Sequence, residues 1–343
     1  MYGKKELYIA IFSYTKGGSL MNSIFASSYE LLLSAISELE LQKDSFVLHP
    51  SVDFSRKRKI SFRDTILSLL TMQGDFLSTT SHDFFQHRLP ADIPSLSALH
   101  QQRAKLLPDA MRYLFYHFTQ RLPTVQTYDG FQLLACDGSD LNISYDPDDR
   151  ESCKPSGNGK RGSNQLHLHA LYDLCNKKHA DIRIEKTMVS NESRALVQML
   201  ENIKSPAKTI ILDDRGYETY HVFVICTKDI SRKGGIAYGF RLPDRELDKD
   251  LEFFVTRSTV HSKRDPVRYK KISPRSVFDF LDLEKDGKQA VCPMKLRMVR
   301  FLLDTGEYEC IVTNLKREEF PPWRIRELYH LRGGICAFLS PIH

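Results

Sequence analysis

The first third of the chain carries apolar residues at helical spacing. In residues 61–72, one helical face carries Phe62, Ile66, Leu69 and Leu70. Residues 94–107 continue this pattern, and Pro108 is suited to begin the next helix. The apolar face of that next helix carries Met111, Leu114, Phe115 and Phe118. The spacing therefore predicts a helical region over residues 1–125.

The pattern changes to that of strands near residue 131. Residues 131–136 are a short apolar run, and residues 165–172 and 179–185 alternate between apolar and polar positions. Within 165–172 one face carries Leu166, Leu168, Ala170 and Tyr172, and the other carries His167, His169 and Leu171. Three consecutive strands of this kind predict an antiparallel meander.

A helix and a further strand follow the meander. Asn191 is a favourable N-cap, and the inward face of the helix carries Ala195, Leu196, Met199 and Leu200. Residues 208–212 are an apolar strand. The order strand, strand, strand, helix, strand predicts an α/β sheet with a parallel crossover at the helix.

The rest of the chain adds two segments. Residues 236–315 read mostly as short strands and turns, and a helix begins near residue 323. The predicted organisation is a helical region (1–125), a first sheet segment (126–235), a β-rich segment (236–315) and a last helix (316–343).

The charge is uneven along the chain. The whole sequence has 49 Lys and Arg against 43 Asp and Glu, a net charge of +6. Residues 255–300 alone hold twelve Lys and Arg against five Asp and Glu, an excess of seven. Such a segment suits a phosphate backbone, although a solvated face is the alternative. The helical region, with the basic run at residues 56–59, fits either a DNA-binding module or a structural cap.

Composition excludes several classes of protein. The seven cysteines include no C-x-x-C pair, which argues against a disulfide framework or zinc site and fits a reducing cytoplasm. No apolar run approaches the roughly 18 residues that a membrane helix needs. With 41% hydrophobic and 27% charged residues, the chain reads as an ordinary soluble globular protein.

Two patterns imitate ligand sites. Residues 157–162 match G-x-G-x-x-G, but they lead into an alternating strand rather than a helix, so a basic hairpin loop fits better than a dinucleotide loop. His167 and His169 share a strand face and could bind a metal. No third ligand stands at a usual spacing, so packing on the strand face is the favoured interpretation.

Carboxylates stand where two sheet strands are predicted to end. Asp137 follows the apolar run 131–136, and Asp213 and Asp214 follow residues 208–212. Ligands commonly bind at the carboxyl ends of strands in α/β sheets, and carboxylates suit Mg²⁺. Two such ions could activate a hydroxyl and stabilise the leaving oxygen of a phosphodiester. A single Asp in this position is also a common turn former or helix cap.

Four stretches together resemble a known family. They are LLACDGSDLNI (133–143), HLHALYDLCNK (167–177), ILDDRGYETYHVF (211–223) and ELYHLRGGI (327–335). They resemble the DDE transposases of bacterial insertion sequences, in the cut-and-paste group whose last motif is Y-(2)-R-(3)-E-(6)-K. The resemblance implies a ribonuclease-H-like mixed α/β core, a helical N-terminal DNA-binding region, and a β-rich insertion between the second Asp and the last helix.

The resemblance assigns roles residue by residue. Asp137 matches the first catalytic, metal-binding Asp and Asp214 the second, with Asp140 and Asp213 as near neighbours that could be confused with them. In the last motif, Tyr329 and Arg332 match the residues that hold DNA phosphates, a role that suits a guanidinium.

The end of the motif departs from the family. Cys336 stands where the third carboxylate, a Glu, is required, and His343 where a Lys is required. Gly333 and Gly334 each cost a helix about 1 kcal/mol, and Pro341 about 3 kcal/mol. A thiolate is a soft ligand that matches Mg²⁺ poorly. We therefore expect a truncated or frameshifted motif and impaired catalysis.

The resemblance implies a function on DNA. Intact relatives bind transposon ends and target DNA as duplexes, and cut and join them with two Mg²⁺ (or Mn²⁺), expected as a homodimer on the chromosome in the bacterial cytoplasm. The competing interpretation is a non-catalytic DNA-binding protein that inhibits a full-length transposase. A third is the product of a decayed gene, which would not fold stably.

Overall fold

We analysed a computed structural model of the chain. It describes residues 19–72, 77–88, 93–156, 161–203, 208–213, 220, 222, 232–235, 245–273, 278, 281 and 291–331. The chain divides into two compact units, Met1–Pro123 and Thr124–His343. Each is described by itself below.

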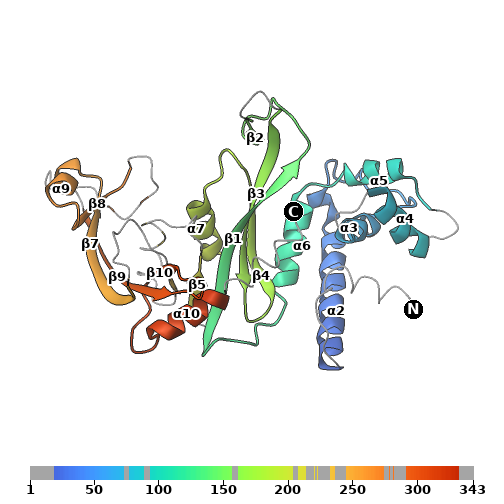
Figure 1. The fold of residues 1–343 in the computed structure, drawn as a ribbon. Helices are drawn as coiled ribbons and strands as arrows, with labels where there is room; N and C mark the ends of the chain where they lie inside the picture. Colours follow the sequence, from blue (N-terminus) through green and yellow to red (C-terminus); the bar gives the residue numbers. More distant parts are fainter. Residues whose placement is uncertain are drawn as a thin grey trace. The chain divides into compact units, whose positions relative to one another are not determined.

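The first unit is mainly helical, as predicted, with one isolated antiparallel bridge between Val47 and Leu106. Its elements are α2 (Ser19–Leu41), the short 3-10 helix η1 (Lys43–Phe46), α3 (Phe62–Leu70), α4 (Leu77–Arg88), α5 (Leu96–Arg103) and α6 (Asp109–Thr119). Pro108 immediately precedes α6, in the place predicted for it. Figure 1 shows these helices in blue and cyan.

Packing and capping explain where these helices form. One apolar cluster joins α2, α3 and α6 through Leu32, Ala35, Ile36, Leu39, Phe62, Ile66, Leu67, Ala110 and Leu114. Ser61 caps α3 by accepting a hydrogen bond from the Asp64 N–H at 3.0 Å, and the Asp64 carboxylate accepts one from the Ser61 N–H in return. The prediction was wrong in one detail. Leu69 is only half-buried, because the buried face of α3 includes Leu67 instead.

The second unit contains one mixed sheet. Its strands are β1 (Phe131–Ile143), β2 (Cys153–Lys154), β3 (Ser163–Asp173), β4 (Lys178–Lys186), β5 (Lys208–Leu212), β6 (Arg232–Gly235), β7 (Leu247–Thr256), β8 (Tyr269–Lys271), β9 (Val291–Leu302) and β10 (Tyr308–Thr313). They lie in the order β2-β3-β1-β5-β6-β10-β9-β7-β8, and β4 also pairs with β3. In the described part of this unit the helices are α7 (Glu192–Glu201), α9 (Thr259–Arg264) and α10 (Pro322–Leu331).

The predicted start of the sheet is confirmed. β1 pairs with β3 and β3 with β4 in antiparallel fashion, and β5 then pairs with β1 in parallel after the α7 crossover. Asn191 caps α7 by accepting a hydrogen bond from the Arg194 N–H at 2.9 Å. The buried residues of α7 are the predicted Ala195, Leu196, Met199 and Leu200.

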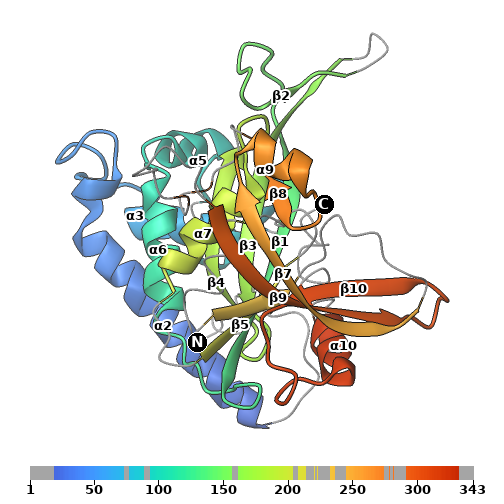
Figure 2. The same ribbon diagram turned by 90° about the vertical axis from the view of Figure 1, so that its left-hand side faces the viewer.

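One strand boundary was predicted wrongly. β1 does not end before Asp137 but continues to Ile143, since β3 supplies antiparallel partners as far as the pair Ile143↔Asn164. The polar residues from Asp137 to Asn142 have low strand propensity, which made them look like a turn. Pairing with β3 overrides that local preference. Figures 1 and 2 both show the far end of this hairpin, with β2, projecting from the sheet.

The two faces of the sheet bury different clusters. One face, here called the α10 face, holds Leu133 and Ala135 of β1, Ala170 of β3 and Leu212 of β5 against Ile325 and Leu328 of α10. The opposite face, the α7 face, holds Leu134 and Cys136 of β1, Leu171 of β3 and Ile211 of β5 against Leu196, Met199 and Leu200 of α7. Strict alternation along β1 and β5 therefore decides which helix each residue meets.

The β-rich segment continues the same sheet. β10 pairs with β6, which lies beside β5, and β9 links β10 to β7. β7 and β9 have ten and twelve residues, longer than the short strands predicted. A separate apolar cluster lies beneath them and includes Phe253, Val255, Met294 and Met298.

Candidate active site

Asp137 lies on the α10 face of the sheet, beside the end of β5. The parallel pairing of β1 with β5 stops at the pair Ala135↔Leu212, so Asp137 lies two residues beyond it. On the β3 side, Asp137 pairs with Ala170, a member of the α10-face cluster. Its carboxylate accepts a hydrogen bond from the Gly138 N–H at 2.9 Å. The side chain is half-buried at the point where the β5 neighbour ends.

Asp140 lies on the opposite face. It pairs across the strands with His167, and its Oδ1 lies 2.6 Å from His167 Nδ1. The other ring nitrogen of His167 lies 3.8 Å from a carboxylate oxygen of Glu192, the first residue of α7. Asp140, the near neighbour of Asp137 in the sequence, therefore lies on the α7 face and contacts His167 there.

Of the paired carboxylates after β5, Asp213 is described and Asp214 lies outside the described residues. Asp213 is buried, with 4% of its surface exposed. It directly follows Leu212, the last residue of β5, which belongs to the α10-face cluster.

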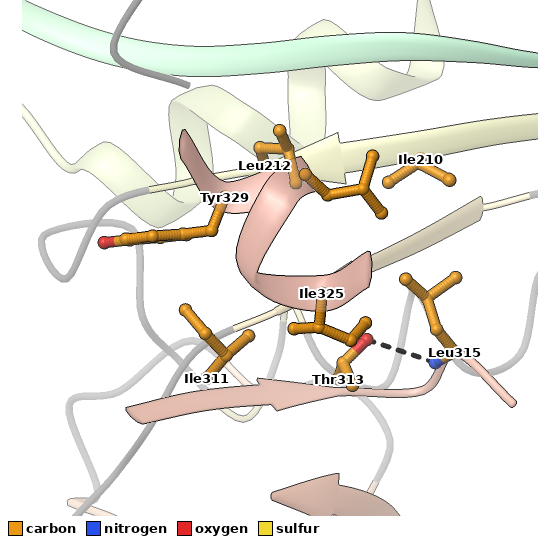
Figure 3. Close-up of a pocket in the computed structure, with 8 residues that line it drawn as sticks. Ile210, Leu212, Ile311, Thr313, Leu315, Ile325 and Tyr329 are labelled. Atoms are coloured by element: carbon orange, nitrogen blue, oxygen red, sulfur yellow. Dashed lines mark hydrogen bonds between the residues drawn. The ribbon is translucent and has the colours of Figure 1, made fainter. Parts of the chain in front are cut away.

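α10 brings Tyr329 onto the α10 face. Ile325 and Leu328 are buried there, and Tyr329 packs against the same cluster. A small cavity of about 20 Å³, room for about one water molecule, lies between α10, β5 and β10. Figure 3 shows Tyr329 at one side of this cavity, with its hydroxyl directed away from the other lining residues. Arg332 and Cys336 lie outside the described residues.

The geometry thus brings together Asp137 and Tyr329 on one sheet face, and separates them from Asp140. A family model for the transposase DDE domain matches residues 128–335. The match covers the sheet, the β-rich segment and α10. The chain belongs to the DDE transposase family. No curated protein matches the chain.

The matched segment starts three residues before β1 and ends at residue 335, one residue before Cys336. Its mixed α/β sheet is consistent with a ribonuclease-H-like core. In the described part of the chain, no helix is long and apolar enough to cross a membrane.

The two imitation sites have structural explanations in this transposase. Of the G-x-G-x-x-G run, only Arg161 and Gly162 are described, and they connect the antiparallel strands β2 and β3. A Cβ on Gly162 would lie 2.7 Å from the backbone oxygen of Lys154, so the close approach of the two strands requires glycine there.

His169 is fully buried on the α7 face, where its Nε2 lies 2.8 Å from the Ser190 hydroxyl. Burial lowers the pKa of His169 to about 4, and the neighbouring His167 adds to that effect. Among the described residues, no three His, Cys, Asp or Glu side chains are grouped to hold a metal ion. His169 therefore acts as a packed, neutral strand residue.

Sequence reasoning missed a buried ion-pair cluster around Asp248. Arg297 of β9 is 4% exposed and meets the Asp248 carboxylate with two hydrogen bonds, of 2.7 and 2.8 Å. Its third nitrogen donates to the carbonyl of Phe320 at 2.6 Å. Arg317 approaches the same carboxylate at 2.9 Å. Hydrogen bonds from Arg297, with a further contribution from Arg317, lower the pKa of Asp248 to about 2. No spacing in the sequence signals this cluster.

Proposed function

We propose that this protein binds duplex DNA at transposon ends and that its capacity to cut DNA is impaired. The observation that carries the proposal is the placement of Asp137. It shares the α10 face with Tyr329, whereas Asp140 contacts His167 on the other face. That arrangement suits Asp137 as the first carboxylate of a DDE site.

Asp214 is the proposed second carboxylate. The support is its place in the sequence: Asp214 stands in the D-R-G-Y stretch that resembles the second catalytic motif, and it comes after β5, the strand that pairs in parallel with β1. Ligands commonly bind where neighbouring strands of an α/β sheet end. Asp137 lies two residues beyond the last β1–β5 pair, which suits the two carboxylates to act together.

The proposed ligands suit the divalent metal that the family uses only in part. Two Asp carboxylates offer the hard oxygen ligands that Mg²⁺ or Mn²⁺ prefers, so Asp137 and Asp214 would hold a divalent ion. When bound, paired ions of this kind activate an attacking hydroxyl and stabilise the leaving oxygen of a phosphodiester. The third position fits poorly, because Cys336 offers sulfur in place of a carboxylate. We therefore assign weak metal binding and no efficient cutting.

The remaining roles follow from charge and position. Tyr329 and Arg332 would hold phosphates near the reacting strand. The helical N-terminal region would contribute to DNA binding through the exposed basic residues 56–59. The protein would act as a homodimer on the chromosome in the bacterial cytoplasm. We further propose that it belongs to the cut-and-paste insertion-sequence group, with its last motif interrupted before the Glu.

A cleavage assay tests the catalytic part. Duplex DNA carrying the sequences that flank the gene is incubated with Mg²⁺ or Mn²⁺, and strand breaks are measured. We expect little cutting by the natural chain and more by the Cys336→Glu variant, because the third hard ligand is restored. Adding Asp137→Asn to that variant should abolish the gain. Adding Asp140→Asn is the matched control and should retain it, since Asp140 lies on the other face.

The outcomes separate the hypotheses. Efficient, Asp137-dependent cutting by the natural chain would overturn the impaired assignment. Cutting by the Cys336→Glu variant that survives Asp137→Asn would overturn the assigned site. If no variant cuts and the chain still binds the DNA, the alternative is favoured, namely a non-catalytic inhibitor of a full-length transposase. That alternative predicts reduced cutting when this chain is added to an active relative.

A further inference from the structure

Exposed cations in the β-rich segment gather in one small lobe. Residues 257–271, here called the basic lobe, include α9 and β8 and contain six Lys and Arg against one Asp. Five of the six residues lie on α9, in the turn after it and on β8: Lys263, Arg264, Arg268, Lys270 and Lys271. Figures 1 and 2 both show α9 and β8 together at one end of β7.

The lobe is an ordered structure. His261 of α9 stacks on Tyr269 of β8 with 5.1 Å between ring centroids, and Tyr269 stacks on Phe254 of β7 at 5.4 Å. The Arg268 guanidinium lies over the Phe254 ring at 5.2 Å. Ser258 caps α9 by accepting a hydrogen bond from the His261 N–H at 3.2 Å. The cations are therefore carried on a fixed platform of stacked rings.

The fold itself makes little use of the charges on this lobe. Lys263, Arg264 and Arg268 are exposed, and no carboxylate in the described part of the chain lies within salt-bridge distance of them. Lys271 donates to the Thr259 hydroxyl at 2.7 Å, which leaves its charge uncompensated. Lys263 and Arg264 do favour the C-terminal end of α9. That effect does not extend to Lys271, which lies outside the helix, whereas Arg268 contacts the Phe254 ring.

Two other described cations of the β-rich segment are neutralised. Arg297 is buried against Asp248, and Lys295 of β9 pairs with Glu252 of β7 at 2.9 Å. In contrast to these two, Lys263 and Arg264 of the basic lobe keep their charge available to a partner. A dense group of exposed cations with a single acidic neighbour matches the phosphates of nucleic acid.

We propose that the basic lobe holds the phosphate backbone of duplex DNA, independently of base sequence. This rests on the proposed function, and it adds the surface and the kind of contact. Lys263 and Arg264 are the central contacts, because both are exposed and lie side by side at the end of α9.

The salt dependence of DNA binding tests the assignment. Binding of the full chain to a fluorescent DNA duplex of arbitrary sequence is measured by anisotropy at NaCl concentrations from about 50 to 200 mM. Each phosphate contact contributes about 0.9 to the slope of log K against log salt. For the Lys263→Ala/Arg264→Ala variant we therefore expect a slope smaller in magnitude by about 1.8.

Two control variants make the result specific. Lys295→Ala removes a cation from the same sheet, but one already paired with Glu252, and should leave the slope unchanged. Lys263→Arg/Arg264→Lys keeps both charges and should also leave it unchanged. Thermal melts of each variant confirm folding. If the wild-type chain binds DNA and the double-alanine variant has the same slope, the assignment of phosphate contacts to the basic lobe is wrong. Absence of DNA binding by the wild-type chain overturns the proposed function together with the lobe.

Discussion

The Asp248 cluster and the basic lobe use the same kind of side chain in opposite ways. Both draw cations from residues 255–300, where Lys and Arg exceed Asp and Glu by seven. Arg297 is 4% exposed and has all three guanidinium nitrogens bonded. Lys263 and Arg264 are exposed. One cation holds β7, β9 and the segment before α10 together, while the others are available to a partner.

The difference shows that the location of a charge decides its role. A buried guanidinium must be paired, because an isolated buried charge is strongly destabilising. An exposed ammonium needs no partner and contributes little to stability. A count of charges along a sequence therefore cannot separate buried, paired cations, which stabilise the fold, from exposed cations, which are available to a partner.

The largest expected effect comes from breaking the buried pair. Asp248→Asn leaves Arg297 buried without its carboxylate, and should lower the free energy of unfolding by about 3 to 5 kcal/mol. Urea denaturation followed by circular dichroism measures this loss. The matched control is Asp250→Asn, since Asp250 pairs with the half-exposed Arg317 and its own side chain is 70% exposed. A loss equal to that of the control would show that the buried pair has no special role.

The next effect concerns a buried group that must stay neutral. His169 has a pKa of about 4 in the folded state, below its ordinary 6.5, so the unfolded chain binds more protons between these values. Stability should therefore fall as the pH falls from 6.5 to 4, by on the order of 3 kcal/mol. Denaturation at several pH values measures this slope.

Two variants assign that slope to its source. In His169→Gln the fall over this pH range should become shallower, because the buried titrating group is gone. His82→Gln removes an exposed histidine and should leave the fall as in the wild-type chain. If both variants keep the wild-type slope, another group is responsible.

The smallest effect on stability is expected in the basic lobe. Lys263→Ala/Arg264→Ala should change the free energy of unfolding by no more than about 0.5 kcal/mol, because neither side chain pairs with a described carboxylate. The same variant should still show the smaller salt dependence of DNA binding described above. A large loss of stability would mean that these cations hold the lobe together, and the comparison with Arg297 would fail.

Elements with clear periodicity were predictable in detail. The inward face of α7 and the Asn191 cap follow from apolar spacing and local capping chemistry, which depend on near neighbours in the chain. The alternation along β3 likewise predicted that Leu168 and Ala170 lie on one face of the sheet and Leu171 on the other. The end of β1 was not predictable this way. Its polar half is a strand only because β3 pairs with it as far as Asn164.

For the candidate site, the sequence by itself determined which carboxylates are candidates, and that the stretches around them resemble the DDE transposase family. Only the tertiary structure decided that Asp137 lies on the α10 face and Asp140 on the other. It also decided that Arg297 is buried in an ion pair with Asp248. The reason is that spacing along a chain records local periodicity. Strand partners, sheet faces and ion pairs join residues far apart in sequence, and only their packing fixes them.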